Sequence, residues 1–302
     1  MCEVSVADVL AIVGPTATGK TALGVRLAQR LGGEVINADS MQLYRGMDIG
    51  TAKPTLAERG GIPHHLLDLW EVAETASVAL YRRYAREVID ELLAAGRVPI
   101  LVGGSGLYLR AVLEAFDFPG TDPDVRARLE AELEVVGAAE MHARLGAADP
   151  AAAAVILPSN GRRIVRALEV MEITGRPFAA SLPDRQPVYD ALQIGLDRTP
   201  DDLDDRVDER VHRMFAAGLV REVRELERRG LRSGLTASRA LGYAQVLRMF
   251  DGELPETEVV DVTARATRRF VRRQRSWFRR DDQIQWLDAT RHDLLAAALA
   301  LC

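Results

Sequence analysis

Hydrophobic residues in the first hundred positions alternate between short continuous runs and longer stretches with helical spacing. Residues 9–13 (VLAIV) form a short apolar run that predicts a buried strand, and residues 21–31 carry apolar residues at helical spacing. Residues 34–38 and 98–102 predict two further strands, with a helix over residues 75–95 between them. This alternation predicts an α/β fold with a mostly parallel, doubly wound sheet, whose sites lie at the carboxyl ends of the strands.

A different pattern follows in the middle of the chain. Helical patterns over residues 123–136, 138–145 and 161–174 are separated by breakers, and strand character returns only at residues 191–196. We therefore predict three parts. Residues 1–116 form the first part of the α/β core, residues 117–187 an all-helical insertion, and residues 188–302 the rest of the core with C-terminal helices.

The loop after the first predicted strand carries the clearest chemical signal. Residues 14–21 read GPTATGKT and match the phosphate-binding pattern G-x-x-x-x-G-K-[ST] between a strand and a helix. The N–H groups of such a loop surround an anion, Lys20 neutralises the outer phosphate, and the Thr21 hydroxyl can reach Mg²⁺. The chain has 39 basic residues but only two lysines, which indicates that Lys20 stands where a compact ammonium is required.

Several phosphate-binding classes lack their signatures here. A GTPase needs Asn-Lys-x-Asp for guanine, but the second lysine, Lys53, lies in TAKP. A motor ATPase places an Asp after an apolar strand, whereas residues 98–102 lead into Gly-Gly-Ser-Gly. Asp39 ends the second predicted strand and is expected to act as a metal partner or as a base. A small-molecule kinase therefore remains open at this point.

Composition and charge add three expectations. The 302 residues are 48% hydrophobic, and the two cysteines lie at the chain ends, which argues against a disulfide framework or a zinc site. No stretch approaches 18 apolar residues, so we expect no membrane partner and a cytoplasmic location. Residues 265–280 contain eight arginines and no acid, interleaved with aromatic residues, despite the net charge of −5. This segment predicts a surface that faces a polyanion, with a solvated helix as the alternative.

Further motifs along the chain resemble those of one family. They are residues 37–54 (NADSMQLYRGMDIGTAKP), 63–68 (PHHLLD), 103–108 (GGSGLY), 160–169 (NGRRIVRALE), 238–245 (SRALGYAQ) and 273–280 (RQRSWFRR). Together with residues 14–21, and in this order, they resemble the tRNA dimethylallyltransferases over nearly the whole chain. The absence of a C-terminal zinc finger indicates the short, bacterial-type form.

The resemblance implies a reaction and a set of catalytic groups. A dimethylallyl group is transferred from dimethylallyl diphosphate to N6 of adenosine 37 in tRNA, without ATP and with Mg²⁺ near Thr21. Asp39 corresponds to the general base, with a metal-orienting carboxylate as the alternative, and Thr16 and Ser105 complete the catalytic set. The expected diphosphate contacts are Gly14, Pro15, Thr16, Ala17, Thr18, Gly19, Lys20, Thr21 and Arg239.

The resemblance also implies a tRNA surface on a protein that we expect to be a monomer. Its expected residues are Asp39, Ser40, Met41, Gln42, Ser105, Arg126, Arg162, Arg163, Ile164, Val165, Arg166, Arg272 and Arg275. Salt bridges remain an alternative for the arginines, including Arg239, and a simple turn remains one for Ser105. His64 and His65 are expected to be structural. Prenylation of free adenine nucleotides and noncatalytic RNA binding stay open as competing functions.

Overall fold

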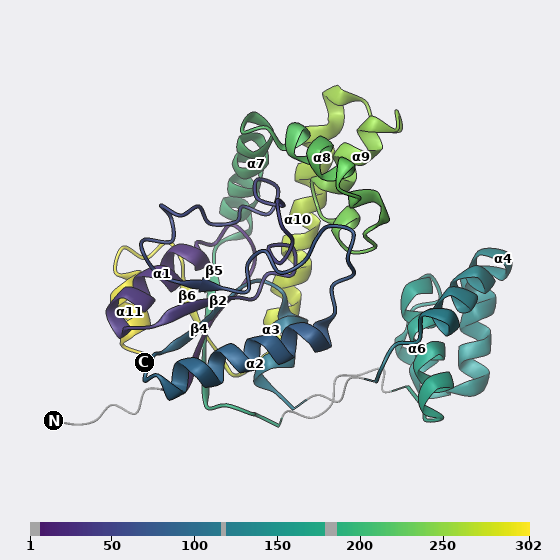
Figure 1. The fold of residues 1–302 in the computed structure, drawn as a ribbon, viewed down its shortest axis with the longest axis horizontal. Helices are drawn as coiled ribbons and strands as arrows, with labels where there is room; N and C mark the ends of the chain where they lie inside the picture. The colour runs from purple at the N-terminus through teal and green to yellow at the C-terminus, as the bar shows by residue number, and fades with distance from the viewer. Residues whose placement is uncertain (1–6, 116–118, 179–185) are drawn as a thin grey trace. The chain divides into compact units, whose positions relative to one another are not determined.

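The computed structural model describes residues 7–115, 119–178 and 186–302. The chain divides into two compact units, one formed by residues 1–114 and 187–302 and the other by residues 115–186 (Figure 1). The predicted boundary at 116/117 falls outside the described residues. Next to it, Glu114 and Pro187 form an antiparallel bridge that brings together the two points where the first unit is interrupted.

A six-stranded parallel sheet organises the first unit, which confirms the predicted α/β fold. The strand order is β3-β2-β4-β1-β5-β6, and every neighbouring pair is parallel. The strands are β1 (Val9–Val13), β2 (Glu34–Asn37), β3 (His64–His65), β4 (Pro99–Val102), β5 (Ala191–Asp197) and β6 (Ile284–Asp288). Because β1 is an interior strand beside β4, the loops that follow β1, β2 and β4 meet at one edge of the sheet.

Helices cover both faces of this sheet because the side chains of a strand alternate between them. Leu10 and Ile12 pack towards α1 and α11, and Val9 and Ala11 belong to the cluster on the opposite face (Figure 1). The helices of this unit are α1 (Lys20–Leu31), α2 (Val78–Ala94), α3 (Gly106–Leu113), α7 (Pro200–Ala216), α8 (Leu219–Arg228), α9 (Tyr243–Phe250), α10 (Val259–Phe278) and α11 (Leu294–Leu299).

The edge strands β3 and β6 were not predicted. β3 has only two residues, and β6 (IQWLD) mixes polar with apolar side chains, so neither carries a buried-strand pattern. They form because a neighbouring strand supplies backbone partners, as in the register of Val35 with His64 and of Gly195 with Trp286.

The second unit consists of helices among the residues described, as predicted. They are α4 (Pro123–Ala148), α5 (Pro150–Val155) and α6 (Gly161–Thr174). The predicted break between two helical segments occurs inside α4, where Gly137 takes a non-helical φ of 80°. Leu129 and Leu145 of α4 pack with Ile164 and Leu168 of α6 in a separate hydrophobic core.

Candidate active site

The loop between β1 and α1 borders a cavity of about 350 Å³ at the carboxyl ends of the strands. Thr16, Ala17, Gly19, Lys20 and Thr21 line it, whereas Gly14, Pro15 and Thr18 are buried beneath. Gly14 has a φ of 126°, and a Cβ there would lie 2.3 Å from the carbonyl oxygen of Leu196 on β5. The glycine that opens the motif therefore lets the loop pass close to the neighbouring strand.

The Lys20 ammonium is held inside the loop and is partly desolvated. Its Nζ donates to the carbonyl oxygen of Pro15 at 2.7 Å. Burial lowers the pKa of Lys20 from 10.5 to about 7, while the Asp39 carboxylate acts to raise it and Arg210 to lower it further. A polyphosphate in this cavity would provide the negative charge that stabilises the protonated ammonium.

Arg210 is a cavity residue that sequence reasoning missed. It lies on α7, lines the cavity, and donates from Nη2 to the carbonyl oxygen of Thr51 at 3.2 Å. Burial lowers the pKa of its guanidinium, and Asp39 opposes the shift. Arg210 sits within an acid-rich helix far from the loop in sequence. Only the packing of α7 with Ala17 of the loop and with α10 reveals that Arg210 accompanies Lys20.

A second cavity of about 320 Å³ adjoins the first. Thr16, Asp39, Thr51 and Arg210 line both cavities. The second cavity is lined in addition by Ser40, Met41, Ser105, Arg239, Met214, Phe270 and Arg273. Arg239 thus lines the second cavity together with Ser40 and Ser105, whereas Lys20 and Gln42 line the first. The two cavities can hold two different ligands with Asp39 at their junction.

The turn after β2 presents the Asp39 carboxylate. The Asn37 side chain shapes this turn, since its Oδ1 accepts from the Asp39 N–H at 3.0 Å and its Nδ2 donates to the Leu66 carbonyl oxygen at 3.1 Å. Oδ1 of Asp39 accepts from the Met41 N–H at 2.9 Å. No hydrogen bond reaches its Oδ2 from the part of the chain that the structure describes. One carboxylate oxygen is therefore fixed and the other can accept a proton from a ligand.

Ser105 and Ser40 connect the turn after β2 to the loop after β4. The Ser105 Oγ accepts from the Ser40 N–H at 3.1 Å and donates to the Ser40 Oγ at 3.2 Å. The predicted site residues in segments 37–42 and 103–106 therefore lie together, in agreement with their positions at the ends of two strands.

A second link between the active-site loops, also not predicted from the sequence, is made by a glutamine of α10. The buried Gln274 side chain accepts from the Thr16 N–H at 3.0 Å and donates to the Gly104 carbonyl oxygen at 2.9 Å. The backbone N–H of Thr16 is thus already hydrogen-bonded to Gln274, although Thr16 lines both cavities.

Three of the six arginines in α10, and Arg279 directly after it, are paired with acids of neighbouring elements. Arg272 binds Asp204 of α7 at 2.7 Å, and Arg275 binds Asp197 at the end of β5 at 2.9 Å. Arg279 shares Asp197, and Arg268 binds Asp208. The predicted tRNA contacts Arg272 and Arg275 therefore occupy salt bridges, and a phosphate would compete with Asp204 and Asp197 for them.

Of the predicted tRNA contacts in the second unit, some are held in salt bridges or in the core, and others are exposed. Arg126 and Arg166 converge on the fully buried Glu169, and the Arg166–Glu169 distance is 2.9 Å. Burial acts to raise the pKa of Glu169, but the hydrogen bonds from both arginines outweigh it and the pKa is lowered. Ile164 and Val165 are buried in the helical core, whereas Arg162 and Arg163 are exposed at the start of α6.

The two histidines occupy β3 at the edge of the sheet. His65 Nε2 lies 2.6 Å from Oε2 of Glu34, and His64 Nδ1 lies 2.9 Å from the Ile62 carbonyl oxygen. Burial lowers the pKa of His64. No group of three or more His, Cys, Asp or Glu side chains suited to a metal occurs among the described residues. In the same ranges, no helix has the length and apolar character needed to cross a membrane.

Comparison with known proteins identifies the family. Residues 42–281 match the model of the IPP transferase family. The chain belongs to this family. It is 66% identical over 291 residues to the tRNA dimethylallyltransferase of Salinispora arenicola, which covers 96% of this chain and 85% of that protein. The Streptomyces coelicolor relative of the same name is 64% identical, and the match covers 97% of this chain and 95% of that protein.

Solved structures of IPP transferase relatives share the fold. A tRNA isopentenylpyrophosphate transferase from Bacillus halodurans superposes with a TM-score of 0.72 at 40% identity, covering 97% of this chain and 96% of that one. A eukaryotic dimethylallyltransferase described as acting on tRNA gives a TM-score of 0.78 at 26% identity, covering 97% and 77%.

Proposed function

We propose that this protein transfers a dimethylallyl group from dimethylallyl diphosphate to N6 of adenosine 37 in tRNA. The observation that supports this most is the position of Asp39 at the junction of two adjoining cavities. One cavity carries the cationic phosphate loop, and the other carries serine hydroxyls beside the apolar Met214 and Phe270. These are the surroundings that a diphosphate donor and a purine acceptor require. The relatives from Salinispora arenicola and Streptomyces coelicolor carry the name tRNA dimethylallyltransferase.

The donor half of the reaction uses the phosphate loop. The bond between the allylic carbon and the diphosphate oxygen breaks, and the electron pair leaves with the diphosphate. Lys20, Arg210 and the N–H groups at the start of α1 would stabilise the charge that develops on this leaving group. Arg239 is proposed as a further contact, reaching the diphosphate from the second cavity.

The acceptor half uses Asp39. The adenine N6 forms the new bond to the allylic carbon and loses one proton, which Oδ2 of Asp39 would accept. Ser40, Met41 and Ser105 would hold the base in the second cavity, and Gln42 would contact it from the first. No ATP is consumed in this scheme.

Mg²⁺ is proposed as the cofactor because the residues present fit it. Thr21 lines the phosphate cavity beside Lys20, and its hydroxyl would be the ligand from the protein. Mg²⁺ usually keeps several waters and is bound in part by substrate phosphates, so it needs no larger cluster of protein ligands. When bound, it would neutralise charge on the departing diphosphate.

Incubation with labelled dimethylallyl diphosphate and unmodified tRNA tests the proposal. We expect label in tRNA, none in tRNA with guanosine at position 37, and none in free AMP. Equal labelling of AMP would favour prenylation of free nucleotides instead. Transfer of phosphate from ATP to a metabolite, without labelled tRNA, would favour a kinase. We further propose that the protein is a cytoplasmic monomer. Sedimentation with and without tRNA checks the oligomeric state.

A further inference from the structure

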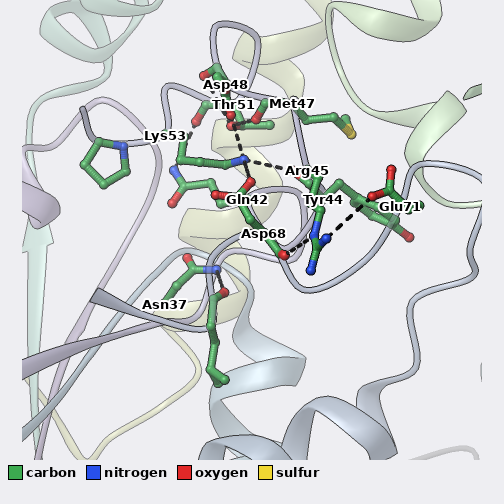
Figure 2. Close-up of polar contacts among 12 residues, drawn as sticks. Asn37, Gln42, Tyr44, Arg45, Met47, Asp48, Thr51, Lys53, Asp68 and Glu71 are labelled. Carbon is green, nitrogen blue, oxygen red and sulfur yellow. Dashed lines mark hydrogen bonds and ion pairs between the residues drawn. The ribbon is translucent and has the colours of Figure 1, made fainter. Parts of the chain in front are cut away.

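The second of the two lysines has no part in the scheme above, yet its side chain is almost completely buried. Lys53 follows Thr51 and Ala52, and its side chain is only 4% exposed. Its Nζ donates to the Tyr44 carbonyl oxygen at 2.8 Å, to Asp48 Oδ1 at 2.7 Å and to Asp68 Oδ1 at 2.6 Å (Figure 2). A lysine ammonium has three N–H donors, and all three are used here.

These three contacts join parts of one long loop that are separate in sequence. Two of the acceptors lie between β2 and Lys53, and Asp68 lies beyond β3. Backbone bonds run along the same junction, from the Asp68 N–H to the Gln42 carbonyl oxygen at 3.3 Å and from the Trp70 N–H to the Leu43 carbonyl oxygen at 3.0 Å. Lys53 therefore connects the segment that follows Asp39 to the segment that follows β3.

The loop that Lys53 closes forms a wall of the active site. Gln42, Thr51, Ala52 and Pro54 line the first cavity, although Lys53 itself does not. Gln42 Nε2 donates to the carbonyl oxygens of Thr51 at 3.2 Å and Ala52 at 3.3 Å. Arg210 donates to the same Thr51 oxygen. The position of Gln42 thus depends on the backbone immediately before Lys53, whereas Arg210 is held by α7.

The backbone around Lys53 adopts conformations that need such support. Four described residues other than glycine have positive φ, and three of them belong to this loop: Ala52 at 48°, Leu66 at 60° and Asp68 at 57°. A residue with a side chain is strained in this region, and the conformation persists where surrounding contacts determine it. Two of these residues adjoin or contact Lys53 directly.

We propose that Lys53 is a positioning residue, whose ammonium holds Gln42 and the Thr51 carbonyl in place between the diphosphate donor and the acceptor base. The role rests on the proposed function of the site. It also explains why lysine occurs here in a chain that otherwise uses arginine. Three acceptors converge on one nitrogen, and a planar guanidinium cannot direct its donors in that arrangement.

A separate anchor makes this role separable from folding. Glu222 of α8 accepts from the backbone N–H groups of Asp48, Ile49 and Gly50 at 3.2, 2.8 and 3.2 Å, and from the Tyr243 hydroxyl at 2.5 Å. The outer part of the loop is therefore held independently of Lys53. Asp48 and Asp68 are also exposed enough, at 58% and 43%, to be solvated when the ammonium is removed.

Lys53→Met, which keeps the length of the side chain, tests the inference. We expect kcat for tRNA prenylation to fall about 10²-fold, the cost of a small misplacement at a reacting centre, with pyrophosphate affinity by calorimetry changed by less than about threefold. Hydrogen exchange should speed up at the Ala52 and Lys53 amides, which bond to Ile49 and Asp48, and stay unchanged in α1. Lys53→Arg should recover less than about a tenth of the activity.

Arg45→Met is the matched control, because Arg45 also bonds the Asp68 residue, through its carbonyl oxygen, but is 56% exposed. We expect its kcat within about twofold of the wild type, as for other exposed ion pairs. Should Lys53→Met fail to fold, Asp68→Asn removes one charged acceptor, and we expect its kcat to fall about tenfold.

Three results would overturn the inference: unchanged kcat in Lys53→Met, full activity in Lys53→Arg, or loss of pyrophosphate affinity in proportion to turnover. A wild-type protein that labels no tRNA would contradict the proposed function instead. The exchange rates at residues 52 and 53 would still report whether Lys53 holds the loop.

Discussion

The side-chain oxygen of Gln274 on α10 accepts a hydrogen bond from the backbone N–H of Thr16 at 3.0 Å, although 258 positions separate the two residues. The amide nitrogen of the same side chain donates to the Gly104 carbonyl oxygen at 2.9 Å. A Cβ at Gly104 would lie only 2.4 Å from that nitrogen. One buried side chain therefore connects the basic helix to both glycine-containing loops of the active site.

Replacing Gln274 by Glu should keep the hydrogen bond from Thr16 and remove the one to Gly104. A carboxylate can still accept from Thr16, but it faces the Gly104 carbonyl oxygen with no proton to donate. We expect a loss of about 2 kcal/mol in the free energy of unfolding, the cost of a buried unpaired polar group, and weaker pyrophosphate binding. Denaturant unfolding and calorimetry measure both. Gln29→Met, which removes the exposed bond to Gly60, is the control and should be near neutral.

Asp39→Ala should lower the rate of the chemical step and leave the binding of pyrophosphate and tRNA nearly intact. A general base contributes about 10²-fold or more to a rate, so single-turnover prenylation should slow by at least that factor. Pyrophosphate and tRNA affinities should change only a few-fold, within about 1 kcal/mol. Rapid-quench kinetics with labelled donor make the measurement. Turnover close to that of the wild type would show that Asp39 is not the base.

The lowered pKa of Lys20 predicts a pH dependence of diphosphate binding. The free protein holds this lysine with a pKa of about 7, and a bound anion raises the pKa because it stabilises the charged form. Binding therefore takes up a proton above pH 7, and affinity should fall by up to about tenfold per pH unit there. Calorimetry in buffers of different ionisation enthalpy detects this uptake. Lys20→Met should bind weakly and lose this part of the pH dependence.

Salt dependence can identify which α10 arginines meet tRNA phosphates. Arg269 and Arg273 have no acidic partner among the described residues, and Arg273 lines the second cavity near Phe270. Each phosphate contact contributes roughly 0.7 to 0.9 to the slope of log affinity against log salt, so Arg269→Gln with Arg273→Gln should flatten it by about 1.5. Filter binding over a salt series measures the slope. An unchanged slope would assign the polyanion surface elsewhere.

Glu169 should support the fold of the helical unit far more than its neighbour Glu172. Glu169 is fully buried between Arg126 and Arg166, so Glu169→Ala removes the carboxylate that both arginines share and should cost about 3 kcal/mol of unfolding free energy. Glu172 pairs with Arg128 at an exposed site, where Glu172→Ala should cost less than about 1 kcal/mol. Thermal unfolding of the two variants makes the comparison. Equal losses would show that the buried charge network does not stabilise this unit.

Local pattern was sufficient to predict the parts of this protein that depend on neighbouring residues. The run from residue 9 to residue 31 specified a strand, a phosphate loop and a helix, and the strand-end positions of Asp39 and Ser105 indicated that they meet. The helical break at Gly137 also followed from a single residue type in its local context. In each case the information lies within a few residues of the feature it determines.

The contacts between distant segments depend on how the folded elements pack. No local pattern placed Arg210 beside Lys20 or joined Gln274 to Thr16, and the salt-bridge alternative for Arg272 was left open until the structure paired it with Asp204. The edge strands β3 and β6 likewise depend on the strands beside them. These features have no local signature because a charge or an amide looks the same in sequence whether it faces water, a ligand or a buried partner. Folding selects among those partners by the cost of leaving a polar group without one.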